Sequence, residues 1–204
     1  IMISAHWDTR PWAENSSTIM RKNQPIIGAN DGASGVAVIL ELAKIMKKNP
    51  PPIGVSLVLF DAEDYGTSAD SWSYAKGSQF FAQNIPINYP MYAINLDMIA
   101  DREPEFYIER YSYQQNPTLV LELWELAESL NLDTFKKQAK YTIFDDHVPL
   151  YQMAGIPAID IIDFDFPNEK TNYHHTHQDI VQNCSPKGLG EVGTLMLNHI
   201  YNIK

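Results

Sequence analysis

Short apolar runs recur along the chain, and most of them end in polar residues that can carry chemistry. The runs at 1–5, 54–60, 91–96 and 158–163 are rich in aliphatic and β-branched residues and predict strands. The run at 54–60, GVSLVLF, is nearly continuous, which is typical of a central strand buried on both faces. Weaker patterns predict further strands at 105–109 and 135–139.

Helical periodicity fills the intervals between these runs. A helix is expected after Gly35, ending at Asn49 before three prolines, and a short one is expected at 75–83. The last helix starts with a Ser185 cap and Pro186 at its first position. The apolar positions predicted to face the core are Val36, Ile39, Leu40, Ala43 and Met46 after Gly35, and Leu119, Leu123, Leu126 and Leu130 in a helix at 118–130.

Composition narrows the class of protein. With 204 residues, 45% hydrophobic and 20% charged, the chain can bury the core of one globular domain. A formal net charge of -10 argues against binding nucleic acid or an anionic membrane surface. The single cysteine, Cys184, excludes an internal disulfide and a thiolate-cage zinc site, so a metal must be held by His and carboxylates. No apolar run approaches the roughly 18 residues of a membrane span.

The start of the chain reads as the middle of a structure. Ile1 is not a natural first residue, and the run at 1–5 already predicts a buried strand. We therefore expect an upstream segment, which would hold any targeting signal.

A glycine-flanked loop carries Asp31, the first candidate metal ligand. Gly28, Gly32 and Gly35 remove Cβ atoms around it, so the backbone can pack closely against strand ends. The simpler alternative is a helix start that Asp31 or Ser34 caps.

The strand ends supply further candidates. His6 follows the first strand, and Asp8, two residues on, can orient its ring. The run at 54–60 ends in Asp61, Glu63 and Asp64, three acids that repel one another unless cations or protons compensate them. Such acids can divide the work, Asp64 binding metal and Glu63 moving a proton.

More acids and imidazoles follow later in the chain. The run at 91–96 ends in Asp97, and Asp145 precedes a short helix. The stretch 172–179 holds His174, His175, His177 and Asp179, and its internal position argues against a purification tag. His and carboxylates together form the ligand type that zinc accepts in catalytic sites. Trp72 lies in a polar loop, where it either lines a pocket or anchors the loop.

In this order and at these intervals, HWD, GANDGASG, DAED, NLDM and HTHQD resemble the motifs of the co-catalytic zinc exopeptidase family that contains the bacterial leucyl aminopeptidases. More narrowly, AHWDTRPWAE, DAEDYG and DDHVPLYQMAGIPAIDII resemble the glutaminyl-peptide cyclotransferases of the animal and bacterial type. The match covers nearly the whole chain. It implies a three-layer α/β/α sandwich with a mixed, mainly parallel central sheet.

The resemblance also implies roles for the candidate residues. Asp31 is the shared metal ligand, Asp64 and His175 hold the main zinc, and Glu63 is the catalytic acid/base. His6 and Asp97 match ligands of a second zinc in the aminopeptidases, whereas the cyclases use one zinc and leave both residues unbound. In a cyclase, Asp97 and Asp145 lie close together and share a proton, which raises one pKa. The alternative for Asp145 is a helix cap for the segment that begins at Asp146.

The chain departs from the cyclase pattern at three positions. Ala62 replaces a common Gly, Asp64 replaces a more usual Glu, and His174 stands where many cyclases have Trp. His174 weakens the aromatic wall expected around the substrate, unless Trp72, Trp7 or Phe166 supplies it.

The sequence therefore predicts that residues 1–204 form one catalytic domain, lacking its amino-terminal portion, of a zinc-dependent glutaminyl-peptide cyclotransferase. Its substrates would be the amino termini of peptides or proteins, its cofactor one Zn²⁺, and its location the periplasm or the exterior, by resemblance alone. The alternatives are an aminopeptidase with two zinc ions and an inactive metal-bound binding protein. The oligomeric state stays open.

Overall fold

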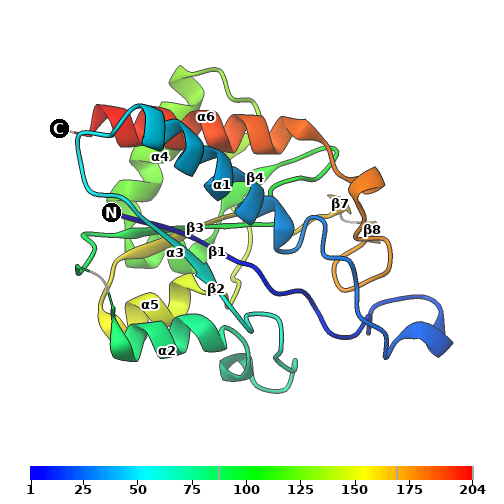
Figure 1. The fold of residues 1–204 in the computed structure, drawn as a ribbon. Helices are drawn as coiled ribbons and strands as arrows, with labels where there is room; N and C mark the ends of the chain where they lie inside the picture. Colours follow the sequence, from blue (N-terminus) through cyan, green and yellow to red (C-terminus); the bar gives the residue numbers. More distant parts are fainter. Residues whose placement is uncertain (87, 169, 204) are drawn as a thin grey trace.

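A parallel sheet of four strands lies at the centre of the computed structural model, which describes residues 1–86, 88–168 and 170–203 (Figure 1). The strand order is β2-β1-β3-β6. Every residue of β1, β3 and β6 is buried, which is why these strands read as continuous apolar runs. The strands are β1 (Met2–His6), β2 (Ser56–Phe60), β3 (Ala93–Asp97) and β6 (Ala158–Ile162).

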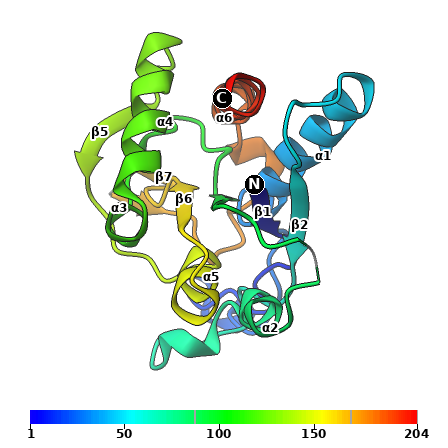
Figure 2. The ribbon, with the colours of Figure 1, turned by 90° about the vertical axis from the view of Figure 1, so that its left-hand side faces the viewer.

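Helices cover both faces of this sheet, so the predicted three-layer α/β fold with a mainly parallel sheet is confirmed. Figures 1 and 2 show α1 (Ala33–Lys48) and α6 (Pro186–Asn202) on one face, and α2 (Lys76–Asn84) and α5 (His147–Ala154) on the other. A second, two-stranded parallel sheet packs beside α4. The remaining elements are α3 (Arg110–Gln115), α4 (Pro117–Ser129), β4 (Phe106–Ile108), β5 (Phe135–Ala139), the antiparallel pair β7 (Pro167–Asn168) and β8 (Thr171–Asn172), and the 3-10 helices η1 (Ile19–Arg21), η2 (Ser71–Ser73) and η3 (Val181–Asn183).

The prediction of a central strand at 54–60 is wrong. Within the described residues β2 pairs with β1 alone, and so lies at an edge of the sheet. Most of its residues are half-buried, and Leu59 is 41% exposed. An apolar run identifies a strand, but the order of strands depends on contacts with distant segments.

The inward face of α1 also differs from the prediction. Val38, Ile39 and Leu42 are buried, whereas Leu40 is 53% exposed. Gly35 also lies on the buried face, where its missing Cβ allows the helix to approach the backbone carbonyl of Leu96 closely. The start of the last helix follows the prediction, since the Ser185 side chain accepts a hydrogen bond from Lys187 N. Its buried apolar residues are Val192, Leu195, Met196 and Ile200.

The parallel register places the polar strand tips at one edge of the sheet. His6 of β1 pairs with Phe60 of β2, and Asp97 of β3 pairs with Ile162 of β6. The loops that follow these strands therefore emerge together, as expected of sites in open α/β sheets. None of the described helices is long and apolar enough to cross a bilayer.

Candidate metal centre and pocket

The loop before α1 holds the Asp31 carboxylate toward the strand tips rather than toward the helix. Asp179 accepts hydrogen bonds from the backbone N–H groups of Asn30 at 2.7 Å and Asp31 at 3.1 Å. The N-cap of α1 is Gly32, and the Ser34 hydroxyl donates to the Asn30 carbonyl. The alternative in which Asp31 or Ser34 caps the helix is therefore wrong. A Cβ atom on Gly32 would overlap the His6 ring, so glycine brings the loop against β1.

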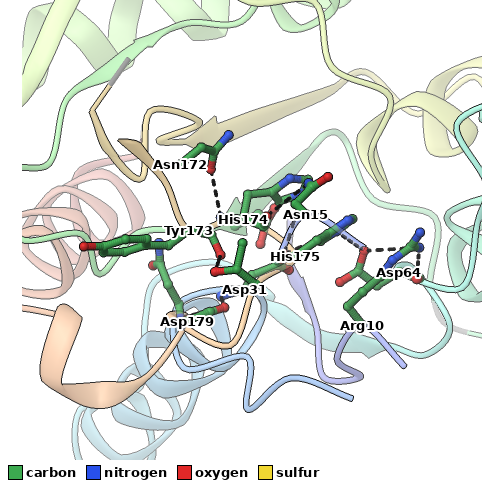
Figure 3. A network of polar contacts seen from close by, with 12 residues as sticks. Arg10, Asn15, Asp31, Asp64, Asn172, Tyr173, His174, His175 and Asp179 are labelled. Carbon is green, nitrogen blue, oxygen red and sulfur yellow. Dashed lines mark hydrogen bonds and ion pairs between the residues drawn. The ribbon is translucent and has the colours of Figure 1, made fainter. Parts of the chain in front are cut away.

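Three donors from distant parts of the chain meet here, and we call Asp31, Asp64 and His175 the front cluster. His175 Nε2 lies 2.8 Å from Asp64 Oδ1 and 3.7 Å from Asp31 Oδ2. Figure 3 shows the three side chains converging from separate loops. Zinc bonds of about 2.1 Å in tetrahedral geometry separate the donor atoms by about 3.4 Å, and the two distances from His175 Nε2 lie on either side of this value. His174 also offers a donor atom here, since atoms of Asp31, His174 and His175 all lie within 4.8 Å of one another. Asp64 Oδ2 is buried and has no hydrogen-bond partner in the described chain, as expected of a metal ligand.

The pKa values of all three groups in the front cluster are shifted from their ordinary values. Burial and the neighbouring Asp64 carboxylate raise the pKa of Asp31 to about 8. Burial would lower the pKa of His175, but its hydrogen bonds to Asp64 and Glu14 raise it to about 9. Burial would raise the pKa of Asp64, but the His175 hydrogen bond lowers it to about 2. The protein thus holds protons where a cation would satisfy the same carboxylates.

Glu14, which the sequence did not single out, orients His175. Its Oε1 atom lies 2.9 Å from His175 Nδ1, the ring nitrogen that faces away from Asp64. A carboxylate on the second nitrogen of a metal-bound His fixes its tautomer and orientation. Arg10 holds Glu14 in place through its Nε, 3.0 Å from Glu14 Oε1. Since 161 residues separate Glu14 from His175, no local spacing could reveal this pair.

The segment at 10–24 is mostly polar in sequence, yet part of it is buried. Arg10 and Ala13 are buried. The guanidinium of Arg10 donates to the backbone carbonyls of Asp64 and Gly66, tying this segment to the loop after β2.

A second set of donors adjoins the front cluster. His6 Nε2 lies 3.1 Å from Asp31 Oδ1 and 3.1 Å from Asp97 Oδ1. Asp31 therefore directs one carboxylate oxygen toward His6 and the other toward His175. The opposite nitrogen, His6 Nδ1, lies 3.1 Å from the Asp8 backbone carbonyl and 3.4 Å from Asp8 Oδ1. The Asp8 carboxylate also accepts hydrogen bonds from Glu63 N and Asp64 N, both at 3.1 Å, so it shapes the turn after β2.

Glu63 and Asp145 are buried beside the front cluster. Burial, then the charges of Asp145 and Asp64, raise the pKa of Glu63 well above its usual value. Burial and the charge of Asp97 raise the pKa of Asp145 to about 6. The N-cap of α5 is Asp146, whose own side chain makes no capping bond to the described chain. Asp145 Oδ2 accepts a hydrogen bond from the Asn95 amide at 2.8 Å, which ties the side chain to β3.

A pocket of about 260 Å³ opens over these groups. His174 forms part of its wall, with its ring stacked on that of His175 at 3.6 Å and tilted against Phe164 at 5.0 Å. Burial and the neighbouring His175 lower the pKa of His174 to about 3, so His174 is neutral. The lining residues are Asp31, Glu63, Asp64, Ser71, Tyr74, Asp97, Met98, Thr142, Ile143, Phe144, Asp145, Ile162, Phe164, His174 and His175.

The aromatic wall comes from residues other than those expected. Phe166 is fully buried in a cluster with Met98 and Ile162, and Phe164 lines the pocket in its place. Strand alternation does not apply there because β6 ends at Ile162. Trp7 is 58% exposed and lies outside the lining. Trp72 lies behind the wall and packs edge to face on Phe144, with ring centroids 4.9 Å apart.

The backbone explains one departure from the cyclase pattern. Ala62 has φ of 53°, a left-handed conformation that favours glycine. The chain makes the same turn with alanine and carries the strain, of order 1 kcal/mol.

Size alone does not identify the functional site. A larger cavity of about 460 Å³ lies between the β4–β5 sheet and the β7–β8 hairpin, lined by Lys136, Lys140, Asp165 and their neighbours. It holds no imidazole, and its lysines and acids neutralise one another. The smaller pocket combines buried acids, imidazoles and an apolar wall, as ligand sites do.

Comparisons with known proteins identify a family and similar structures. A family model described as Peptidase family M28 matches residues 1–200. Aminopeptidase YwaD from Bacillus subtilis is 26% identical over 209 residues, covering 98% of this chain, which spans 40% of that protein. A solved glutaminyl cyclase from Bacteroides thetaiotaomicron is 35% identical, with a TM-score of 0.94, and the match covers 100% of this chain and 73% of that one. A leucine aminopeptidase precursor from the same organism is also 35% identical, with a TM-score of 0.93 and coverage of 100% and 72%.

Proposed function

The chain belongs to peptidase family M28, and we propose that it is a zinc-dependent glutaminyl-peptide cyclotransferase. The proposed reaction converts an amino-terminal glutamine of a peptide or protein into pyroglutamate and releases ammonia. The observation that carries this proposal is Asp145, a buried carboxyl on the pocket wall whose charge acts on Glu63. The similarity to a glutaminyl cyclase over the whole chain supports it.

In this proposal the front cluster holds one zinc ion. Asp31, Asp64 and His175 offer the carboxylate and imidazole donors that zinc accepts, with Glu14 behind His175. A zinc ion bound there would polarise the γ-carboxamide of the substrate.

Glu63 is the proposed acid/base. It takes a proton from the substrate α-amine, whose nitrogen forms the new bond to the δ-carbon, the carbonyl carbon of the side-chain amide, while the bond from that carbon to the amide nitrogen breaks. It then returns that proton to the departing ammonia, so its charge is restored at the end of the cycle. A pKa above the usual carboxyl value suits a group that must both accept and give up a proton near neutrality.

Asp97 and Asp145 are proposed to act as a pair beside Glu63. The charge of Asp97 raises the pKa of Asp145, as expected of neighbouring carboxyls that cannot both ionise without cost. Asp97 also lies 3.1 Å from His6. With Asp97 engaged in this way, neither Asp97 on the pocket wall nor the buried His6 would hold a metal. His174, Phe164, Phe144 and Tyr74 would enclose the glutamine side chain.

A specific observation favours a second candidate. His6, Asp31 and Asp97 place one donor atom each within 4.8 Å of one another, a second cation-sized group that shares Asp31 with the front cluster. With zinc at both places, the site would suit an aminopeptidase, in which Glu63 serves as base for a water molecule. The similarity to Aminopeptidase YwaD agrees with this alternative.

We also propose that the protein is exported and that residues 1–204 belong to its catalytic domain. One similar structure is described as that of a precursor, which supports the proposal of an exported enzyme. Residues 1–204 would form its catalytic domain, acting on peptide or protein amino termini and not on nucleic acid.

Assays with matched substrates test the proposal. Purified protein, loaded with zinc, is given a glutaminyl peptide and a leucyl peptide. Ammonia release with one zinc per chain is expected. Release of leucine with two zinc ions would establish the aminopeptidase instead, and failure to turn over either substrate would favour a binding protein. Glu63→Gln should lower kcat about 100-fold to 10,000-fold and retain zinc. An unimpaired Glu63→Gln variant would refute the role of Glu63.

A further inference from the structure

Behind the pocket lies a second group of buried polar side chains that the proposed reaction leaves without a role. We call Asn95, Glu109, His147 and Asp160 the rear cluster. All four are 0% exposed. They come from β3, the residue before α3, the first residue of α5 and the middle of β6. Burying so many polar groups is costly, so their arrangement calls for a physical explanation.

Glu109 and His147 form the back of the cluster. His147 Nε2 lies 3.2 Å from Glu109 Oε2. Burial would raise the pKa of Glu109, but His147 lowers it to about 2. Glu109 also accepts hydrogen bonds from the N–H and hydroxyl groups of Ser112, at 2.6 and 2.9 Å. The same hydroxyl accepts a hydrogen bond from Asp160 N at 2.9 Å, so the Glu109 network fixes the backbone at Asp160.

Asn95 connects the rear cluster to the pocket. Its Nδ2 donates to Asp145 Oδ2 at 2.8 Å and approaches Asp160 Oδ1 at 3.4 Å. Ser4 donates to Asn95 Oδ1 at 2.9 Å, so the amide group must present its nitrogen to the two carboxyls. The other Asp145 oxygen accepts from Asp146 N. Both oxygens of Asp145 therefore receive hydrogen bonds from within the protein.

We propose that Asp160 is a positioning residue, which acts as a neutral acid and, together with Asn95, holds the Asp145 carboxylate in its orientation toward the pocket. This inference rests on the proposed function, in which Asp145 lines the reacting site. Asp160 lies on β6 and does not line the pocket, so its effect on the reaction is exerted through Asp145.

Geometry and charge support a neutral Asp160. The groups that face it are Asp145, Asp97, Glu109 and His147. Asp145, His147 and Asp160 offer atoms within 4.8 Å of one another, and Asp160 Oδ2 lies 4.0 Å from His147 Nδ1. Burial, then the charges of Asp145, Asp97 and Glu109, raise the pKa of Asp160 well above its usual value. With Asp145 already accepting two N–H groups, the proton of such a carboxyl pair belongs on Asp160.

A cation is the competing explanation for this cluster. Asp160 Oδ2 and His147 Nδ1 have no hydrogen-bond partners within the part of the chain described here. A metal between them would require an ionised Asp160, and its best third ligand, Asp145, is already bonded to Asn95 and Asp146. The two explanations predict opposite results for an amide at position 160.

The experiment compares Asp160→Asn with Asp160→Ala in the full chain, loaded with zinc. An amide has the shape of a neutral acid and can donate to Asp145, so Asp160→Asn should keep kcat within about threefold. Alanine removes the donor, and a misplaced Asp145 should lower kcat about 10-fold to 100-fold while KM changes by less than about threefold. Crystal structures should show Asp145 unmoved in Asp160→Asn and turned away in Asp160→Ala.

Controls keep the result interpretable. Asp163→Asn changes another buried carboxyl, which lies just beyond β6 and accepts hydrogen bonds from Glu105 N and Asp165 N. This variant should leave activity unchanged. If Asp160→Ala does not fold, Asn95→Ala removes the same support from the other side and should show the same loss of kcat. Ammonia release by the unmodified protein tests the proposed function separately, and the orientation of Asp145 in the crystals does not depend on it.

Three results would overturn the inference. One is an Asp160→Ala variant, or in its place an Asn95→Ala variant, with unchanged kcat and an unmoved Asp145. Another is an Asp160→Asn variant as impaired as Asp160→Ala. The third is the loss of one bound metal ion per chain in Asp160→Asn, which would identify the rear cluster as a cation site.

Discussion

The front and rear clusters contain similar types of side chain but differ in their proposed functions. Each combines buried carboxylates with one imidazole, and Asp145 lies between them. In the front cluster the donors border a pocket, and Asp64 Oδ2 has no partner in the described chain. In the rear cluster Glu109 is met by Ser112 and His147, and Asn95 directs its amide at Asp145. Because Asp160 Oδ2 of the rear cluster also has no partner in the described chain, the comparison teaches that access to a pocket, rather than residue types or an unpaired oxygen, distinguishes a metal site from a supporting network.

The largest expected effect is in the front cluster. Asp64→Asn removes a charged donor, so zinc binding should be lost and activity should fall by at least about 1,000-fold, since a metal contributes several kcal/mol to the transition state. Metal content and kcat/KM are the measurements. Asp61→Asn changes an exposed acid after the same strand and should leave both unchanged. Full zinc occupancy in Asp64→Asn would show that Asp64 is not a zinc ligand.

The next effect should fall on stability rather than on zinc. Glu109→Gln breaks the buried pair with His147 and should lower the free energy of unfolding by about 3 kcal/mol, while zinc content stays unchanged. Urea unfolding followed by circular dichroism measures the loss. Glu128→Gln disrupts the exposed pair with Lys137 and should cost less than about 1 kcal/mol. Equal effects of the two variants would show that the rear pair contributes no more than a surface pair.

Glu14 lies between His175 of the front cluster and the buried Arg10. Glu14→Gln weakens the hold on His175 and should lower zinc affinity about 10-fold to 100-fold, as changes behind metal-bound imidazoles do. Competition with a fluorescent chelator gives the affinity. Glu41→Gln, which alters an exposed ion pair on α1, is the control. An unchanged affinity in Glu14→Gln would show that His175 needs no orienting carboxylate.

Removing the metal should reverse the effect of pH on stability. The raised pKa values of Asp31, about 8, and His175, about 9, mean that the metal-free folded protein binds more protons than the unfolded chain. Their stabilising contribution is complete below the unfolded pKa values and is lost as pH rises through about 8 to 9. Metal-free protein should therefore be more stable at pH 6 than at pH 9, by about 1 kcal/mol or more. Zinc, which replaces these protons, should stabilise the protein more at pH 9 than at pH 6. Thermal unfolding with EDTA or zinc measures both, and a metal-free protein that gains stability as pH rises would contradict the assignment.

The two clusters also differ in how far the sequence predicts them. His6, Asp64 and Asp97 follow apolar strands, and the tips of parallel strands meet at one edge, so their convergence can be predicted from pattern. The glycines around Asp31 indicate its close approach. Glu109 precedes a helix that the periodicity did not predict, and Asn95 and Asp160 sit inside buried strands, where they read as interruptions of an apolar run. Their contacts depend on strand order, which local sequence does not encode.

Strand order and loop paths account for the remaining differences. The position of β2 at the edge of the described sheet, the rotation of α1 and the burial of Phe166 all depend on packing between distant segments. Glu14 reaches His175 because Arg10 ties its segment to the loop after β2 and Asn15 donates to the backbone carbonyls of His174 and His175.

The central claim is that the front cluster, and not the rear cluster, binds the catalytic metal. Anomalous diffraction at the zinc edge from crystals grown with zinc tests it directly. The account predicts one strong peak about 2.1 Å from donor atoms of Asp31, Asp64 and His175, with none beside His147. A peak confined to His147 and Asp160, or no peak at saturating zinc, would contradict it.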